Sequence, residues 1–255
     1  MRGWLVIGAG ALLLAAALAI EAPATLLDSR VADLTAGRIR LVAATGTVWR
    51  GSGELALQPD GVRIPVAWRL EPIALLRGGL AGSLTTAEAN RPATFHVERE
   101  DFDVHDLAIA LPAGSVLRSA GLPDALANTG GTLTLDVANL ARRGDRLEAQ
   151  ADLKWLDASL PAPLAGARIA LGDIRVLAAG SGSEVPATLA NSGGDVDIAG
   201  TMVFSGHDAP QIDARIKPRA GLPADRNQAI GAVLSGIGRA DGAGGYRVVW
   251  PLIVR

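Results

Sequence analysis

The stretch Val62–Leu70 reads VRIPVAWRL and shows the pattern that decides the fold. Two sets of side chains alternate along it: Val62, Ile64, Val66, Trp68 and Leu70 against Arg63, Pro65, Ala67 and Arg69. A period of two places these sets on opposite faces of a β-strand, one buried and one exposed. Proline cannot donate to a strand ladder, so Pro65 predicts an edge or a bulge.

The same alternation recurs along the rest of the chain. It is found in residues 39–43, 55–57, 132–137, 147–154, 169–176, 196–204, 212–217 and 246–254. The 31 glycines and 14 prolines supply the turns between these short strands. Short helices are predicted over 22–34, with Pro23 in its first turn, over 113–120 and over 225–234, with Asp225 as an N-cap. The predicted fold is mainly β, an antiparallel domain that forms an open curved sheet or a sandwich with a few short helices.

Two glycine-rich segments resemble each other. Leu126–Leu135 (LANTGGTLTL) matches Leu189–Ile198 (LANSGGDVDI), and Ala43–Trp49 (AATGTVW) is a looser third copy. The matches predict a repeated β-hairpin unit whose copies cover one another's apolar faces. The alternative is a chance resemblance between turns that are rich in glycine.

The N-terminal segment Gly3–Ile20 (GWLVIGAGALLLAAALAI) carries no charged side chain. As a helix rising about 1.5 Å per residue it would be roughly 27 Å long, close to the thickness of a bilayer core. Arg2 precedes it and Glu21 follows it, which predicts a cytoplasmic N-terminus. We therefore expect a tip and transmembrane anchor over 1–21 and a periplasmic β domain over 22–255. The expected membrane contacts are Trp4, Leu5, Val6, Ile7, Leu12, Leu13, Leu14, Leu18 and Ile20. The alternative is a cleaved signal peptide.

Composition excludes several classes of function. The 255 residues include no cysteine, which excludes disulfides, iron–sulfur clusters and a thiol nucleophile. There are 24 basic and 26 acidic side chains, a formal net charge of −2, without any basic tract. Nucleic-acid binding needs a positive footprint, so it is not expected.

Residues 96–106 (HVEREDFDVHD) form the only dense polar cluster. His96, Glu98 and Glu100 share one strand face, and Asp103 and His105 could share a face of a following strand. One interpretation is a metal-dependent hydrolase. The other is a solvated strand face with Phe95, Val97, Phe102 and Val104 on the buried side. No serine elbow is present, and Asp241–Gly245 is predicted to be a hairpin turn rather than a phosphate loop. We expect a protein that is not an enzyme, without catalytic, cofactor-binding or metal-binding residues, without a cofactor and without a small-molecule substrate.

The most distinctive string is Gly46–Gly53 (GTVWRGSG), and physical reasoning alone reads it as a bulged strand with a core tryptophan. It is followed by Trp68-Arg69-Leu70, Pro72, Leu75-Leu76-Arg77-Gly78 and a final strand that begins Gly-Gly-Tyr246. Together with the apolar N-terminus, this order resembles protein N of the bacterial type II secretion system. The residues that carry the resemblance are Gly46, Thr47, Trp49, Gly51, Gly53, Trp68 and Pro72.

The resemblance implies a single-pass protein of the Gram-negative inner membrane with its bulk in the periplasm. It implies an accessory role in a machine that exports folded proteins through an outer-membrane secretin, and no catalytic residues. The expected partners are the inner-membrane platform subunits and the secretin, and the expected role is scaffolding. The alternative is a lipid-handling envelope protein with an apolar β groove.

Overall fold

The computed structural model describes residues 21–119, 128–161, 168–206 and 208–250. The expected membrane anchor, from Trp4 to Ile20, lies outside these residues, as does His207. Within the described part of the chain, no helix combines the length and the apolar character needed to cross a bilayer.

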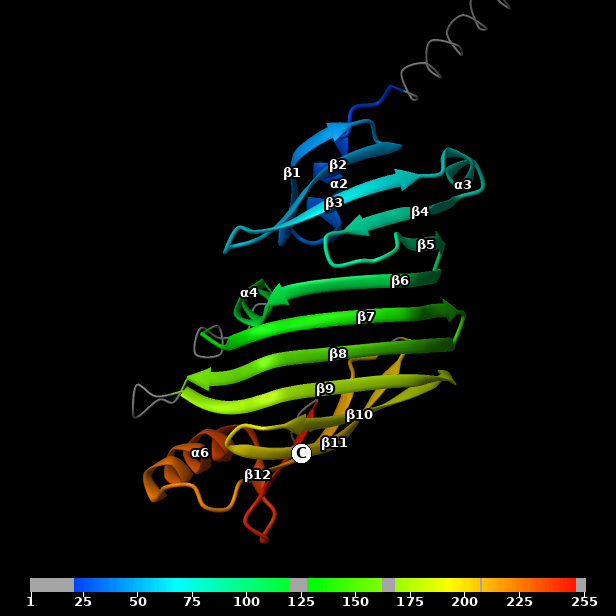
Figure 1. Cartoon of the computed structure of the whole chain (residues 1–255). Helices are drawn as coiled ribbons and strands as arrows, with labels where there is room; N and C mark the ends of the chain where they lie inside the picture. The colour runs from blue at the N-terminus through cyan, green and yellow to red at the C-terminus, as the bar shows by residue number, and fades with distance from the viewer. Residues whose placement is uncertain (1–20, 120–127, 162–167, 207, 251–255) are drawn as a thin grey trace, which may run out of the picture.

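The described residues form one open antiparallel sheet of 14 strands (Figure 1). The strand order follows the chain from β1 to β12, and β14 then lies between β12 and β13. The strands are β1 (Ile39–Gly46), β2 (Arg50–Leu57), β3 (Val62–Leu70), β4 (Gly79–Thr86), β5 (Ala93–Glu98), β6 (Asp101–Pro112), β7 (Gly130–Arg143), β8 (Arg146–Pro161), β9 (Arg168–Gly182), β10 (Glu184–Ser192), β11 (Val196–Ser205), β12 (Gln211–Pro218), β13 (Arg239–Ala240) and β14 (Tyr246–Trp250). This confirms the mainly β class and decides for the open sheet over the sandwich.

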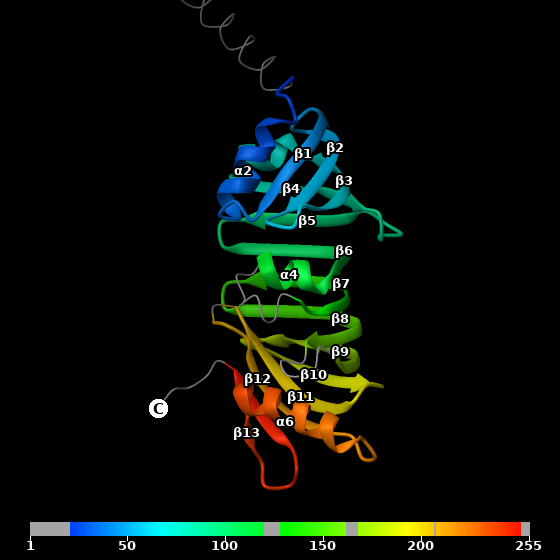
Figure 2. The same cartoon turned by 90° about the vertical axis from the view of Figure 1, so that its left-hand side faces the viewer.

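Among the described residues, four helices accompany the sheet: α2 (Leu26–Leu34), α3 (Pro72–Leu76), α4 (Ala113–Ser119) and α6 (Ala224–Ile237). Figure 2 shows α4 and α6 in front of the strands, on the side turned toward the viewer. Two details of the prediction are wrong. Pro23 is not in a helical turn, because it forms a β-bridge with Thr47 before α2 begins. Asp225 is not the N-cap, because Pro223 takes that position and Asp225 already lies in the first turn of α6.

The face of the sheet that carries the buried side chains is here called the inner face, and the opposite one the outer face. Three clusters of buried side chains form the core. The first joins Leu41, Val66 and Trp68 to Ala24, and the second centres on Val185 between β8 and β11. The third packs Ile230 and Leu234 of α6 against β8, β9 and β11.

The C-terminal half of the sheet curls toward its inner face, so the end of β11 returns to β7, and β12 passes behind β9 in Figure 1. Arg142 of β7 spans the curl. Its Nε donates to the Glu100 carbonyl oxygen at 2.9 Å, and its Nη1 donates to the Gly206 carbonyl oxygen at 3.0 Å. The guanidinium carbon lies 5.7 Å from the centre of the Phe102 ring, at a cation–π distance. One side chain thus ties the turn after β5 to the end of β11.

The prediction of an edge or a bulge at Pro65 is wrong, because β3 lies between β2 and β4 and its register with β2 runs unbroken through Pro65. Pro65 pairs with Glu54 of β2, whereas the ladder between β3 and β4 starts only at Val66. The bulge of this region lies in β1, which does not pair with β3: the register of β1 with β2 shifts between Val42 and Thr45, where Ala43 has φ 52°. β4 has no residue opposite Pro65, so the missing N–H of the proline leaves no position of the β3–β4 ladder unsatisfied.

The repeated hairpin is found in only two of its three expected places. Gly193 and Gly194 form the turn between β10 and β11, and Gly46 begins the turn between β1 and β2. Gly130 and Gly131 instead begin β7, which follows α4 rather than a paired strand. The unit is therefore not a repeated hairpin at that position, because a helix intervenes between β6 and β7.

Candidate functional site

The resemblance-bearing residues gather around Trp68 at the N-terminal end of the sheet. Trp68 is 8% exposed, and its indole N–H is shared between the Val48 carbonyl oxygen at 3.0 Å and the Thr47 carbonyl oxygen at 3.3 Å. Gly51 is its cross-strand neighbour, and a Cβ there would lie 2.5 Å from Trp68 Cζ2. Glycine is thus required opposite Trp68, since any other side chain would collide with the indole.

The other glycines of the motif let two backbones approach closely. Gly46 has φ +87°, and a Cβ there would lie 2.5 Å from the Arg50 carbonyl oxygen. A Cβ on Gly53 would lie 3.1 Å from Leu41 Cδ1 and 3.1 Å from the Val42 carbonyl oxygen. The missing side chains at Gly46 and Gly53 thus allow β1 and β2 to form a tight hairpin that packs against Trp68.

This hairpin holds the segment that leads in from the N-terminus. The backbone N–H of Ala24 donates to the Gly46 carbonyl oxygen at 3.1 Å, and the N–H of Val48 donates to the Ala22 carbonyl oxygen at 2.8 Å. Pro23 bridges to Thr47 between them, and Ala24 is 1% exposed. The chain entering from residues 1–21 is therefore bonded directly to the motif.

Trp49 and Pro72 complete the set from the side of β3. The Trp49 carbonyl oxygen accepts from the Leu70 N–H at 2.7 Å, and Pro72 occupies the first turn of α3. Trp49 itself is only half-buried, so the core tryptophan of this region is Trp68.

The histidine cluster places its side chains on one face, but each histidine meets a different carboxylate. His105 Nε2 lies 3.1 Å from Asp103 Oδ2, and His96 Nε2 lies 3.8 Å from Glu98 Oε2. In the part of the chain that the structure describes, no group of three acidic or histidine side chains is arranged to hold a metal ion. Val97, which was expected to be buried, is 37% exposed, because it sits at the open end of β5.

The inner face carries two apolar rows that run across four strands. Ile109, Leu135, Leu153 and Val176 pair across β6–β9, and Leu111, Leu133, Trp155 and Ile174 form the next row. All eight side chains are half-buried. The rows therefore offer a continuous apolar surface that the helices cover only in part.

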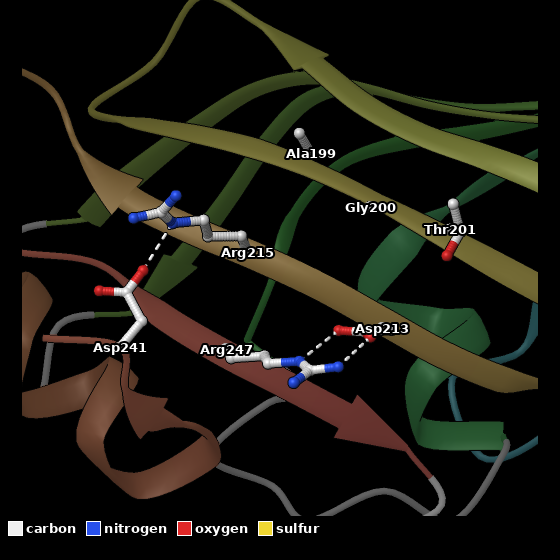
Figure 3. Close-up of a pocket in the computed structure, with 7 residues that line it drawn as sticks. All are labelled: Ala199, Gly200, Thr201, Asp213, Arg215, Asp241 and Arg247. Atoms are coloured by element: carbon white, nitrogen blue, oxygen red, sulfur yellow. Dashed lines mark hydrogen bonds and ion pairs between the residues drawn. The ribbon is translucent and has the colours of Figure 1, made fainter. Parts of the chain in front are cut away.

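A shallow pocket of about 440 Å³ lies on the outer face, over β11, β12 and β14 (Figure 3). Arg247 meets Asp213 through two hydrogen bonds, Nε to Oδ1 at 2.8 Å and Nη2 to Oδ2 at 2.5 Å. Arg215 Nε lies 2.5 Å from Asp241 Oδ2. In Figure 3 the two guanidinium groups point in opposite directions along the strands, so they do not converge on one small ligand.

The carboxylates of this pocket are held in their charged form. The hydrogen bond from Arg247 lowers the pKa of Asp213. The backbone N–H groups of Ala243 and Gly245 lower the pKa of Asp241, with Arg215 adding to the effect. Sequence reasoning missed this site, since its arginines come from strands and a turn whose register only the fold establishes.

The described residues thus define an open-sheet β protein that offers extended surfaces rather than an enclosed catalytic cleft. The chain belongs to the family of type II secretion system protein N, whose family model matches residues 37–249. The resemblance of the Trp68 motif is thereby confirmed at the level of the family, which implies an accessory role in type II secretion and association with the cell envelope. No curated protein and no solved structure matches the chain.

Proposed function

We propose that this protein is a non-enzymatic scaffold of the type II secretion apparatus, held in the inner membrane by residues 3–20. The sheet would lie in the periplasm, where its surfaces contact platform subunits or the secretin. The supporting observation is the hydrogen bonding of Ala22–Ala24 to the turn of the β1–β2 hairpin, at Gly46–Val48. A segment fixed in this way transmits its position to the sheet, so a membrane anchor before it would also fix the sheet.

The test combines gene deletion with crosslinking in cells. Deletion should reduce release of the exported proteins, and crosslinkers placed on the sheet should capture secretion subunits. Normal release after deletion, together with no captured subunit, would sink the proposal. Cell fractionation and protease access to residues 22–255 test the proposed topology, and a shortened mature chain would indicate a cleaved signal peptide.

A second candidate function is lipid handling, and the two apolar rows across β6–β9 favour it. A half-buried surface of this kind can bind acyl chains, whose contacts need no hydrogen-bond partners. The full chain would then carry lipid through purification, and Leu135→Asp would remove it. A chain free of lipid, or one whose lipid is unaffected by Leu135→Asp, would leave scaffolding as the only candidate.

A further inference from the structure

Three arginines lie in register across the last strands of the sheet. Arg215 of β12 pairs with Arg247 of β14, and Arg247 pairs in turn with Arg239 of β13. Directly paired residues of antiparallel strands project from the same face about 5 Å apart. Lys217 projects from this face too, because it lies two residues after Arg215. These four residues are here called the cationic ladder.

The ladder carries more positive charge than its surroundings neutralise. Asp213 and Asp241 pair with Arg247 and Arg215. The residues that the structure describes supply no ion-pair partner to Arg239 or Lys217. Asp197 of β11 lies opposite Lys217, but it forms its ion pair with Arg219. With Arg219 included, five cations face three carboxylates, in a chain whose formal net charge is −2.

Packing does not explain this arrangement. Like charges directly opposite each other destabilise a sheet. Arg215 and Arg247 have side chains that are 54% and 62% exposed, so neither contributes much buried area. A ladder that keeps Arg239 and Lys217 without an ion-pair partner among the described residues, and that remains accessible, is suited to binding an anionic partner.

The position of the ladder is also suited to an intermolecular contact. Figure 1 shows the strands that carry it at the opposite end of the sheet from β1 and the N-terminus. An anchor at the N-terminal end would leave this end free to meet other proteins. β13, which carries Arg239 at the edge of the sheet, is only two residues long.

We propose that the cationic ladder docks an acidic segment of a partner protein within the secretion apparatus, an inference that rests on the proposed scaffold function. The mixture of signs favours a protein over a lipid surface. Asp213 and Asp241 lie among the arginines, so a uniformly anionic headgroup layer would be repelled at two points. An acidic protein segment can place its own basic or neutral residues there, and it can align its carboxylates with Arg239 and Lys217.

The experiment uses the full chain in detergent and the purified periplasmic domains of the platform subunits and secretin of the same system as probes. Binding to one of them should weaken about tenfold in the double variant Arg239→Glu, Lys217→Glu, and should weaken with added salt. The matched control is Arg50→Glu, Arg69→Glu, which reverses a paired, exposed arginine couple at the other end of the outer face. Reversing acidic residues of the bound probe to lysine should restore its binding to the Arg239→Glu, Lys217→Glu variant.

A folding defect is distinguished from lost docking by thermal unfolding. Lys217→Glu places a carboxylate opposite Asp197, whereas Arg239→Glu removes a like-charge contact with Arg247. The single variant Arg239→Glu should therefore unfold at the same or a higher temperature than the wild type while it binds more weakly. The proposal is overturned if the ladder variant binds every probe as the wild type does, or if only vesicles of phosphatidylglycerol bind in a ladder-dependent way. If deletion of the gene stops export while the ladder variant supports it fully, the docking inference fails and the scaffold function stands.

Discussion

Gly51 and Trp68 face each other across β2 and β3 so closely that a single added carbon would lie 2.5 Å from the indole ring. A similar relationship recurs in the middle of the sheet, between β7 and β8. A Cβ on Gly131 would lie 2.8 Å from Trp155 Nε1, and that indole donates to the Gly130 carbonyl oxygen at 2.9 Å. Each tryptophan thus lies close to a glycine backbone, and its indole N–H donates to a backbone carbonyl oxygen nearby.

Gly51→Ala should therefore destabilise the domain by about 1–3 kcal/mol, because neither the indole nor the backbone can move away cheaply. Urea unfolding measures this change. Gly236→Ala in α6 is the matched control. Nothing lies within 4 Å of the added carbon there, and alanine should stabilise the helix by about 0.5–1 kcal/mol. Equal stability of the two variants would contradict the close packing at Gly51.

Trp68→Phe should loosen the segment that enters from the N-terminus. Loss of the indole donor leaves the Val48 and Thr47 carbonyl oxygens without this partner, at a cost of about 1–2 kcal/mol. Limited proteolysis should then cut around Ala22–Ala24. Trp155→Phe loses an equivalent bond to Gly130, far from this segment, and should lower stability without exposing the cleavage sites. Equal cleavage in both variants would indicate global unfolding instead.

Ile230→Ala should cost about 2–5 kcal/mol, because its side chain is 1% exposed and fills the core between α6 and the sheet. Ile237 lies on the same helix and is 44% exposed, so Ile237→Ala should change the unfolding free energy by less than about 1 kcal/mol. Thermal or urea unfolding of the pair measures both. Similar losses would mean that α6 does not contribute its face to the core.

Asp152 and Arg175 should contribute a pH-dependent coupling. The hydrogen bond from Arg175 lowers the pKa of Asp152, and Lys154 adds to it. Because the folded pKa is below the unfolded one, the stabilisation is complete above a pH of about 4 and is lost as the pH falls through the folded value. A double-mutant cycle of Asp152→Asn and Arg175→Gln should give less than about 1 kcal/mol at neutral pH, because the pair is partly exposed. That coupling should vanish in acid; a pH-independent value would refute the assignment.

The histidine cluster should not bind a metal ion needed for function. His96→Ala combined with His105→Ala should leave bound zinc and protein export unchanged, since the two rings meet different carboxylates. Elemental analysis of purified protein and an export assay measure the two effects. Loss of stoichiometric zinc in the double variant would revive the hydrolase interpretation.

Strand positions were predictable where large apolar residues alternate, as in Val62–Leu70 and Leu147–Lys154. β4 and β10 were not: glycine, alanine, serine and threonine dominate β4, and β10 carries a proline and only two large apolar side chains, Val185 and Leu189. Trp68 and Trp155 each follow a glycine-rich segment in the sequence. Their indole contacts with the preceding turns depend on hairpin register and could not be derived.

Local chemistry determined how each segment behaves: period-two patterning made strands, glycines made turns, and the Gly46–Gly53 string with Trp68 indicated the family. Only the tertiary structure decided that the sheet stays open, that it curls around the span of Arg142, and that Arg215, Arg247 and Arg239 stand side by side. The physical reason is that strand pairing joins residues far apart in the chain. A shift of one residue in register would send each side chain to the opposite face.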